Sequence, residues 1–127
     1  MFPLNCWYVA AMPAQLADGK ILSRTICDLP VAIYRDHGKH PVALLDRCPH
    51  RLFPLSAGEL TDRGLQCAYH GLTFAADGRC VDIPTQPEIP PTACVRSFPM
   101  REGHGFIWLW PGDPALAEAS PLPTFPT

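Results

Sequence analysis

Short apolar runs alternate with turn residues along most of the chain, and each run has the length of a β-strand. Turn residues that include glycine separate the runs in pairs, at 36–39, 77–78 and 102–105, which predicts three antiparallel hairpins. The paired strands are expected at 31–34 and 42–45, at 72–74 and 80–83, and at 95–98 and 106–110. No stretch shows sustained helical periodicity, and only 115–119 is compatible with a short helical turn. The pattern predicts an all-β fold of antiparallel sheets.

Proline is frequent in this chain, with 16 residues, ten of them from Pro84 onward. Four prolines, at 84, 87, 90 and 91, predict an extended surface loop, because proline fixes φ and cannot donate a hydrogen bond to a sheet. Three more, at 121, 123 and 126, are typical of a connector between domains. We therefore expect one domain over residues 1–113 and a proline-rich connector over 114–127.

Composition narrows the class of protein. The 127 residues suit a single domain, with 47% hydrophobic residues and a formal net charge of -2. The ten basic and twelve acidic residues are spread along the chain, so no nucleic-acid partner is expected. No apolar run approaches the roughly 20 residues that cross a bilayer, and the N-terminus lacks the basic start of a signal peptide. These features predict a cytoplasmic protein without a membrane segment.

Two short motifs each offer one thiolate and one imidazole. They are Cys48-Pro49-His50 and Cys67-Ala68-Tyr69-His70. In a Rieske-type 2Fe-2S cluster, two cysteines bind one iron and two histidines bind the other, so each motif can supply one ligand to each metal. We predict that Cys48, His50, Cys67 and His70 hold such a cluster, which would make the chain an electron-transfer domain.

Tetrahedral zinc is the main alternative for these four ligands, since two thiolates and two imidazoles also make a closed structural site. Zinc sites usually pair like ligands within one short motif, whereas both motifs here are mixed. The other four cysteines, at 6, 27, 80 and 94, lie in or beside apolar segments. We expect them to be reduced and to behave as small hydrophobic residues rather than as a disulfide framework.

Several segments resemble the N-terminal Rieske domain of the Rieske non-haem iron oxygenases. The likeness is carried by 47–51 and 67–74, which contain both motifs, and by the flanking segments 1–10 and 105–113. Within that family the chain is most similar to the group that includes the vanillate O-demethylase oxygenase subunits. The chain differs from the common pattern at Leu52 and Leu72, where the family usually has glycine and tryptophan.

This resemblance implies a Rieske fold in which two hairpin loops project and close over the cluster. Around the ligands it implies supporting roles for Arg51, Tyr69, Gly71 and Leu72. Arg51 would pair with a partner's carboxylate or form an ordinary surface ion pair, and Tyr69 would pack or hydrogen-bond beside the cluster.

The kind of Rieske centre also follows from comparison with the high-potential proteins of respiratory complexes. Those proteins carry an extra disulfide between the loops, at the places of Phe53 and Tyr69, and a serine at the place of Leu72. A missing hydroxyl donor stabilises the reduced cluster less. We therefore expect a reduction potential near the low end of the range of about -150 to +300 mV.

The resemblance further implies the partners. An NAD(P)H-dependent flavin and iron-sulfur reductase would deliver the electron, and a mononuclear Fe(II) would receive it. That iron would lie in a catalytic domain beyond this chain, in the same subunit or in a neighbouring subunit of a homotrimer. The intact enzyme would be a monooxygenase that hydroxylates or O-demethylates aromatic compounds, and no catalytic residue is expected in this chain.

Two observations bear on the alternatives to that function. The remaining histidines, His37, His40 and His104, fall in predicted turns and are expected to be exposed rather than to form a second metal site. A freestanding Rieske ferredoxin would end near the last strand, whereas this chain continues beyond Asp113. A zinc-stabilised interaction module without redox activity is the other alternative.

Overall fold

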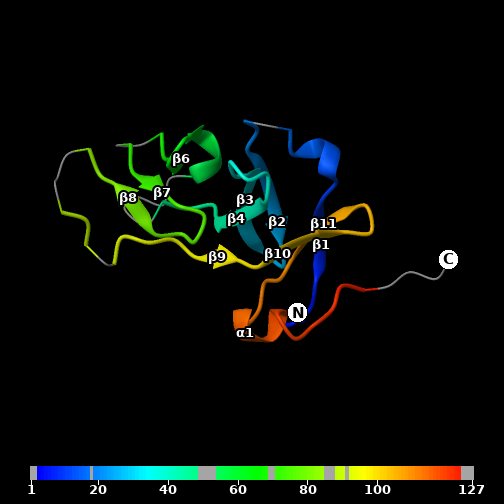
Figure 1. The fold of residues 1–127 in the computed structure, drawn as a ribbon. Helices are drawn as coiled ribbons and strands as arrows, with labels where there is room; N and C mark the ends of the chain where they lie inside the picture. Colours follow the sequence, from blue (N-terminus) through cyan, green and yellow to red (C-terminus); the bar gives the residue numbers. More distant parts are fainter. Residues whose placement is uncertain are drawn as a thin grey trace.

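Three antiparallel sheets make up the fold, and they follow one another along the molecule (Figure 1). The computed structural model describes residues 3–17, 19–48, 54–68, 71–84, 88–90 and 92–123. The first sheet has the order β1-β11-β10, with β1 at Tyr8–Ala11, β10 at Met100–Gly103 and β11 at Phe106–Leu109. The second has the order β2-β3-β4-β9, with strands at Leu22–Ile26, Leu29–Arg35, Pro41–Leu45 and Ser97–Phe98. The third has the order β5-β6-β7-β8, with strands at Glu59–Thr61, Gly64–Gln66, Thr73–Phe74 and Cys80–Asp82.

Helical structure is limited to three short elements in the described residues. These are the 3-10 turns η1 at Pro13–Gln15 and η2 at Leu55–Ala57, and the α-helix α1 at Pro114–Ala117. The Asp113 side chain caps α1 by accepting a hydrogen bond from the Ala115 N–H at 3.0 Å. The expected helical turn is present, but it spans Pro114–Ala117 rather than 115–119. The all-β fold of antiparallel sheets is confirmed.

The central strands β3 and β4 of the second sheet are buried on both faces, which explains why they are almost continuously apolar. Successive side chains of a strand point to opposite faces. Val31 and Ile33 of β3 pack with the first sheet, whereas Ala32 and Tyr34 pack with the third sheet. The core thus has two parts, one on each side of the central sheet.

A third group of buried side chains covers the outer face of the first sheet. Trp7 and Trp110 meet edge to face with their ring centroids 5.2 Å apart, and Trp108 lies in the same cluster. All three indole N–H groups donate to backbone carbonyls at 2.9–3.0 Å. The three tryptophans are therefore packing residues of the core.

Two of the three predicted hairpins are confirmed and one is wrong in its first strand. The turns at 36–39 and 77–78 join β3 to β4 and β7 to β8. The last hairpin pairs β10 with β11, while the expected partner strand at 95–98 instead places Phe98 beside Ala43 of β4. Pro99 separates β9 from β10. Because proline has no N–H to give to a ladder, the chain changes sheets at that residue.

Two hairpins were not expected from the sequence, β2 with β3 and β5 with β6. The strands β2 and β3 are joined through Cys27 and Asp28, which have φ angles of 51° and 63°. Positive φ at both central residues defines a tight two-residue turn whose usual residues are asparagine and glycine. Cysteine and aspartate give little signal for such a turn.

The C-terminal part of the described chain packs against the first sheet. Ala117 of α1 is buried with the tryptophans, and Leu122 packs against the same cluster. The Arg101 guanidinium donates to the carbonyls of Ala117 and Ser120 at 3.3 and 3.1 Å. The segment expected to be a connector therefore contacts the domain as far as Leu122.

Candidate iron-sulfur site

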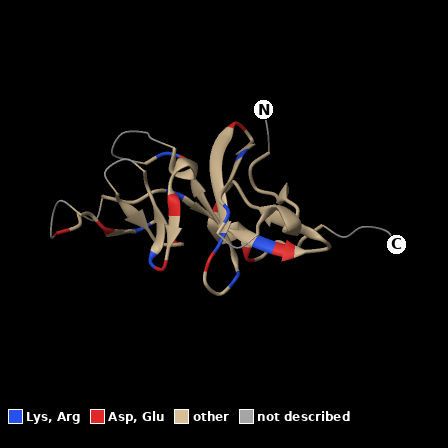
Figure 2. Ribbon diagram, turned by 90° about the horizontal axis from the view of Figure 1, so that it is seen from above, with Lys and Arg blue, Asp and Glu red and all other residues tan. Residues whose placement is uncertain are grey.

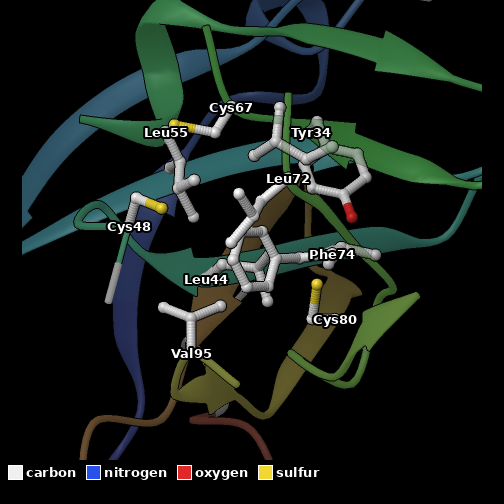
Figure 3. Packing of buried hydrophobic residues seen from close by; sticks show 12 residues of the cluster. Tyr34, Leu44, Cys48, Leu55, Cys67, Leu72, Phe74, Cys80 and Val95 are labelled. Carbon is white, nitrogen blue, oxygen red and sulfur yellow. The ribbon is translucent and has the colours of Figure 1, made fainter. Parts of the chain in front are cut away.

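The two cysteines of the ligand motifs are buried in one core cluster. Cys48 follows β4 and is 0% exposed, and Cys67 follows β6 directly and is 1% exposed. Both belong to the cluster between the second and third sheets. Figure 3 shows both sulfur atoms at the same end of this cluster, near the Leu55 side chain. The structure therefore brings together two thiols from segments far apart in sequence.

The histidines of the motifs, His50 and His70, lie outside the described residues, as do Arg51, Phe53 and Tyr69. Within the ranges that the structure describes, no group of three or more potential ligands is placed to hold a metal ion. The described half of the predicted ligand set fits an iron-sulfur cluster, because the thiols of Cys48 and Cys67 share one buried site. Thiolates are the soft ligands that iron-sulfur clusters require.

The second ligand loop joins the paired strands β6 and β7, as expected for a hairpin. The Cys67 N–H donates to the Leu72 carbonyl at 2.7 Å, which closes the loop at its base. Gly71 has a φ of +71°, where side chains other than glycine are strained. The Leu72 side chain is 5% exposed and packs in the core (Figure 3). Gly71 and Leu72 therefore shape this loop, and Leu72 offers no hydroxyl.

The first ligand loop differs from the expectation, because it is not a hairpin tip. It leaves β4, which pairs with β3 and β9, and leads by way of η2 to β5, which belongs to the third sheet. This loop is therefore a connection between sheets. No ladder hydrogen bonds of its own strands hold its two ends together.

Hydrogen bonds that the Asp46 carboxylate accepts hold the two described ends of this loop together instead. Asp46 is 6% exposed, and its carboxylate accepts hydrogen bonds from the Ser56 N–H at 2.7 Å and the Ser56 hydroxyl at 2.6 Å. The Ser23 hydroxyl lies 3.4 Å from the same carboxylate. Sequence reasoning missed this residue. Its only signal is an acidic side chain between an apolar strand and a ligand motif.

The other four cysteines form no disulfide, and they differ in burial. Cys80 is 3% exposed and burial raises the pKa of its thiol, whereas Cys6 and Cys27 are half-buried. The Tyr8 hydroxyl lies near the thiols of Cys6 and Cys27, and its hydrogen bonding with Cys27 raises the pKa of Tyr8. Cys94 is exposed, so the expectation of an apolar environment is wrong for this residue. It lies in an isolated bridge at the edge of the fold.

The three remaining histidines lie in or beside turns and are exposed, as expected. His40, for example, has its Nδ1 3.6 Å from the Asp36 carboxylate in the turn between β3 and β4. A cavity of about 620 Å³ lies beside this turn and the turn between β5 and β6. Its lining includes neither Cys48 nor Cys67, so it is separate from the ligand loops.

Basic and acidic residues are interspersed along the described part of the chain (Figure 2). The clearest ion pair joins Arg35 to Glu102 at 2.8 and 3.1 Å, and it connects the second sheet to the first. No helix in the described ranges is long and apolar enough to cross a membrane.

The fold has three antiparallel sheets, and two cysteines from separate loops are buried together between two of them. This arrangement is the one expected of an iron-sulfur domain whose cluster is held by two loops. The chain belongs to the Rieske 2Fe-2S domain family, which it matches over residues 6–99. The recognition made from the ligand motifs is thereby confirmed, and so is the cofactor type.

Comparison with known proteins places this domain among oxygenase components. The chain is 50% identical to the oxygenase component of dicamba O-demethylase from Stenotrophomonas maltophilia, over 98% of this chain and 37% of that protein. It is 43% identical to a vanillate O-demethylase oxygenase subunit from Pseudomonas sp. (strain HR199), over 93% of this chain and 33% of the relative. The crystal structure of apo dicamba monooxygenase superposes with a TM-score of 0.91, at 50% identity, over 98% of this chain and 37% of that one. The chain thus spans about a third of the length of these relatives.

Proposed function

We propose that this chain is the electron-entry domain of a Rieske non-haem iron oxygenase component. Its substrate would be an aromatic acid or an aromatic methyl ether, by analogy with the dicamba and vanillate O-demethylases that it resembles. A separate reductase would supply electrons, and a mononuclear iron in a catalytic domain would receive them. The observation that carries the proposal is the burial of the two motif thiols, Cys48 and Cys67, in one core cluster of a chain of this family.

In this proposal Cys48 and Cys67 bind one iron and His50 and His70 bind the other. The bound cluster would supply reversible one-electron transfer. The protein contributes burial on the thiolate side, where Leu55 and Leu72 exclude water from the two cysteines. Exclusion of water and the absence of a hydroxyl at position 72 both affect the potential, because solvent exposure and hydrogen bonds to sulfur tune iron-sulfur centres. We expect a potential near the low end of the Rieske range.

The histidine ligands suit electron exit. Each imidazole would bind iron through one nitrogen and keep an N–H on the other, which can donate to a carboxylate of the acceptor domain. Arg51 and Tyr69 flank these ligands in sequence and would contribute to that contact. A homotrimer with electron transfer between neighbouring subunits, a flavin-containing reductase and a cytoplasmic location belong to the same proposal. The proposal also includes a domain boundary near Asp113, followed by a connector over 114–127 whose residues Ala117 and Leu122 pack on the domain.

The test is a substitution of His70 by cysteine in the isolated chain, with His37→Cys as the matched control. His37 is an exposed histidine in a turn that belongs to neither ligand motif. The His70→Cys chain is expected to keep a 2Fe-2S cluster with a lower potential, because a thiolate adds negative charge where a neutral imidazole was. The His37→Cys chain should keep the potential of the unchanged protein.

Iron, sulfide and zinc contents, dithionite-reduced EPR spectra and redox titrations provide the readout. Zinc without iron, together with no absorption change on reduction, would identify the zinc-stabilised module instead. An unchanged potential in His70→Cys would contradict the ligand assignment. A potential above about +100 mV in the unchanged protein would contradict the assignment to the low-potential type.

A further inference from the structure

The buried carboxylate of Asp46 lies at the start of the first ligand loop. Among the described residues, only Asp46 and Thr73 are polar or charged and buried. A buried carboxylate is costly unless hydrogen-bond donors surround it. Here the donors come from a single residue on the far side of the loop, Ser56, with a longer contact from Ser23.

The hydrogen bonds of Asp46 connect three separate elements. Its own N–H donates to the Pro30 carbonyl at the start of β3, at 2.9 Å. One carboxylate oxygen accepts from the backbone of Ser56 in η2, and the other accepts from the hydroxyl of Ser56. Hydrogen bonds to a charged acceptor are the strong ones in proteins. Asp46 therefore ties η2 to the end of β4, directly beside the central sheet.

This tie closes the base of the segment that contains Cys48 and His50. The residue next to Ser56 is Leu55, which is 0% exposed and packs in the cluster that holds both ligand cysteines. Figure 3 shows the Leu55 side chain near the sulfur atoms of Cys48 and Cys67. By fixing η2, Asp46 also fixes the side chain that packs against the thiols.

We propose that Asp46 is a positioning residue for the iron-sulfur cluster: by binding Ser56 it holds together the two described ends of the first ligand loop. The inference rests on the proposed ligand set. It predicts that Asp46 determines how firmly the cluster is held and what electronic environment it has, although Asp46 itself is not a ligand. Removal of an outer-shell residue that orients metal ligands commonly lowers the affinity for the metal by about 10-fold to 100-fold.

A second aspartate in the chain provides a matched control. Asp36 directly follows β3, as Asp46 follows β4, and its carboxylate accepts the backbone N–H of His40 at 2.9 Å. That turn carries none of the four predicted ligands. Asp36→Ala thus removes a similar side-chain hydrogen bond to a loop without touching the ligand loops.

The experiment loads the full chain with its cluster and measures three quantities in parallel. These are the rate of cluster loss to an iron chelator, the EPR spectrum of the reduced state and the reduction potential. Asp46→Ala is expected to lose its cluster about 10-fold faster or more, with a changed EPR spectrum and potential, while Asp36→Ala stays within about twofold of the unchanged chain. Asp46→Asn keeps an acceptor for the Ser56 N–H, so it should largely restore cluster retention. Its potential should be more positive, because a negative charge near the cluster is lost.

The inference is overturned if Asp46→Ala matches the unchanged chain in all three readouts, or if Asp36→Ala produces the same changes. It is also overturned if Asp46→Asn loses its cluster as fast as Asp46→Ala does. Should Asp46→Ala fail to fold, Ser56→Ala decides by the same comparison with Asp36→Ala, since it removes only the hydroxyl contact. A wild-type chain that never forms a 2Fe-2S cluster would refute the proposed function instead, which keeps the two failures distinguishable.

Discussion

Replacement of Leu55 by alanine tests whether the thiol side of the site depends on apolar packing. Leu55 is 0% exposed and belongs to the cluster between the second and third sheets. Burying a leucine side chain contributes about 1.5–3 kcal/mol, and a residual cavity adds to the loss when the walls cannot collapse. The walls here come from β-strands of two different sheets, which hydrogen bonds hold in place. We therefore expect Leu55→Ala to lower the free energy of unfolding by about 2–5 kcal/mol.

Such a loss is a large share of the total free energy of unfolding, which is only about 5–15 kcal/mol for a typical domain. Leu109→Ala is the control, because Leu109 is equally buried but lies in the other core, which contains neither ligand cysteine. Both variants should unfold at lower urea concentration when loaded chains are compared by tryptophan fluorescence. Only Leu55→Ala should also release its cluster faster to a chelator, because water gains access to the thiolates.

Two results would refute this reasoning. A loss of less than about 1 kcal/mol in Leu55→Ala would mean that the site collapses around the smaller side chain. Equal rates of cluster release in Leu55→Ala and Leu109→Ala would mean that release follows global stability and not local packing at the cysteines.

The remaining predictions concern one glycine turn and one ion pair. An alanine Cβ at Gly78 would lie 1.9 Å from the Val95 carbonyl oxygen, whereas one at Gly105 would meet nothing within 4 Å, although both have a positive φ. In urea unfolding, Gly105→Ala should lower the free energy of unfolding by about 1–2 kcal/mol, because of the strained backbone conformation alone. Gly78→Ala should lower it clearly more, because the new Cβ also clashes with the Val95 carbonyl. Equal losses in the two variants would contradict the clash. Arg35 hydrogen bonds lower the pKa of Glu102, so their stabilisation is present at neutral pH and disappears as the pH falls through that lowered pKa. Glu102→Gln should therefore lower the free energy of unfolding by about 1 kcal/mol or less at pH 7, because the Glu102 side chain is 39% exposed. In acid the same substitution should have almost no effect. A destabilisation that grows on acidification would contradict a stabilising ion pair.

The parts of the fold that the sequence predicted are those in which local signals and tertiary structure agree. Apolar runs separated by glycine turns identified β3 with β4 and β7 with β8, since alternation and turn chemistry act over a few residues. The strand at 95–98 was assigned to the wrong partner, because nothing local tells a strand which sheet it joins. The turn through Cys27 and Asp28 was missed because its positive φ angles are imposed by the surrounding strands rather than favoured by the residues.

The sequence by itself determined the cofactor class, because the choice of iron ligands is a matter of residue type and short spacing. The two motifs, each with one cysteine and one histidine, specify the ligand types independently of the tertiary fold. Tertiary structure decided how the cysteines are supported. Asp46 becomes a buried tie to Ser56, and Leu55 becomes a neighbour of both thiols, only because β4 and η2 pack together in the folded chain. Hydrogen bonds and packing between distant segments depend on the whole arrangement of the sheets, and no local pattern encodes them.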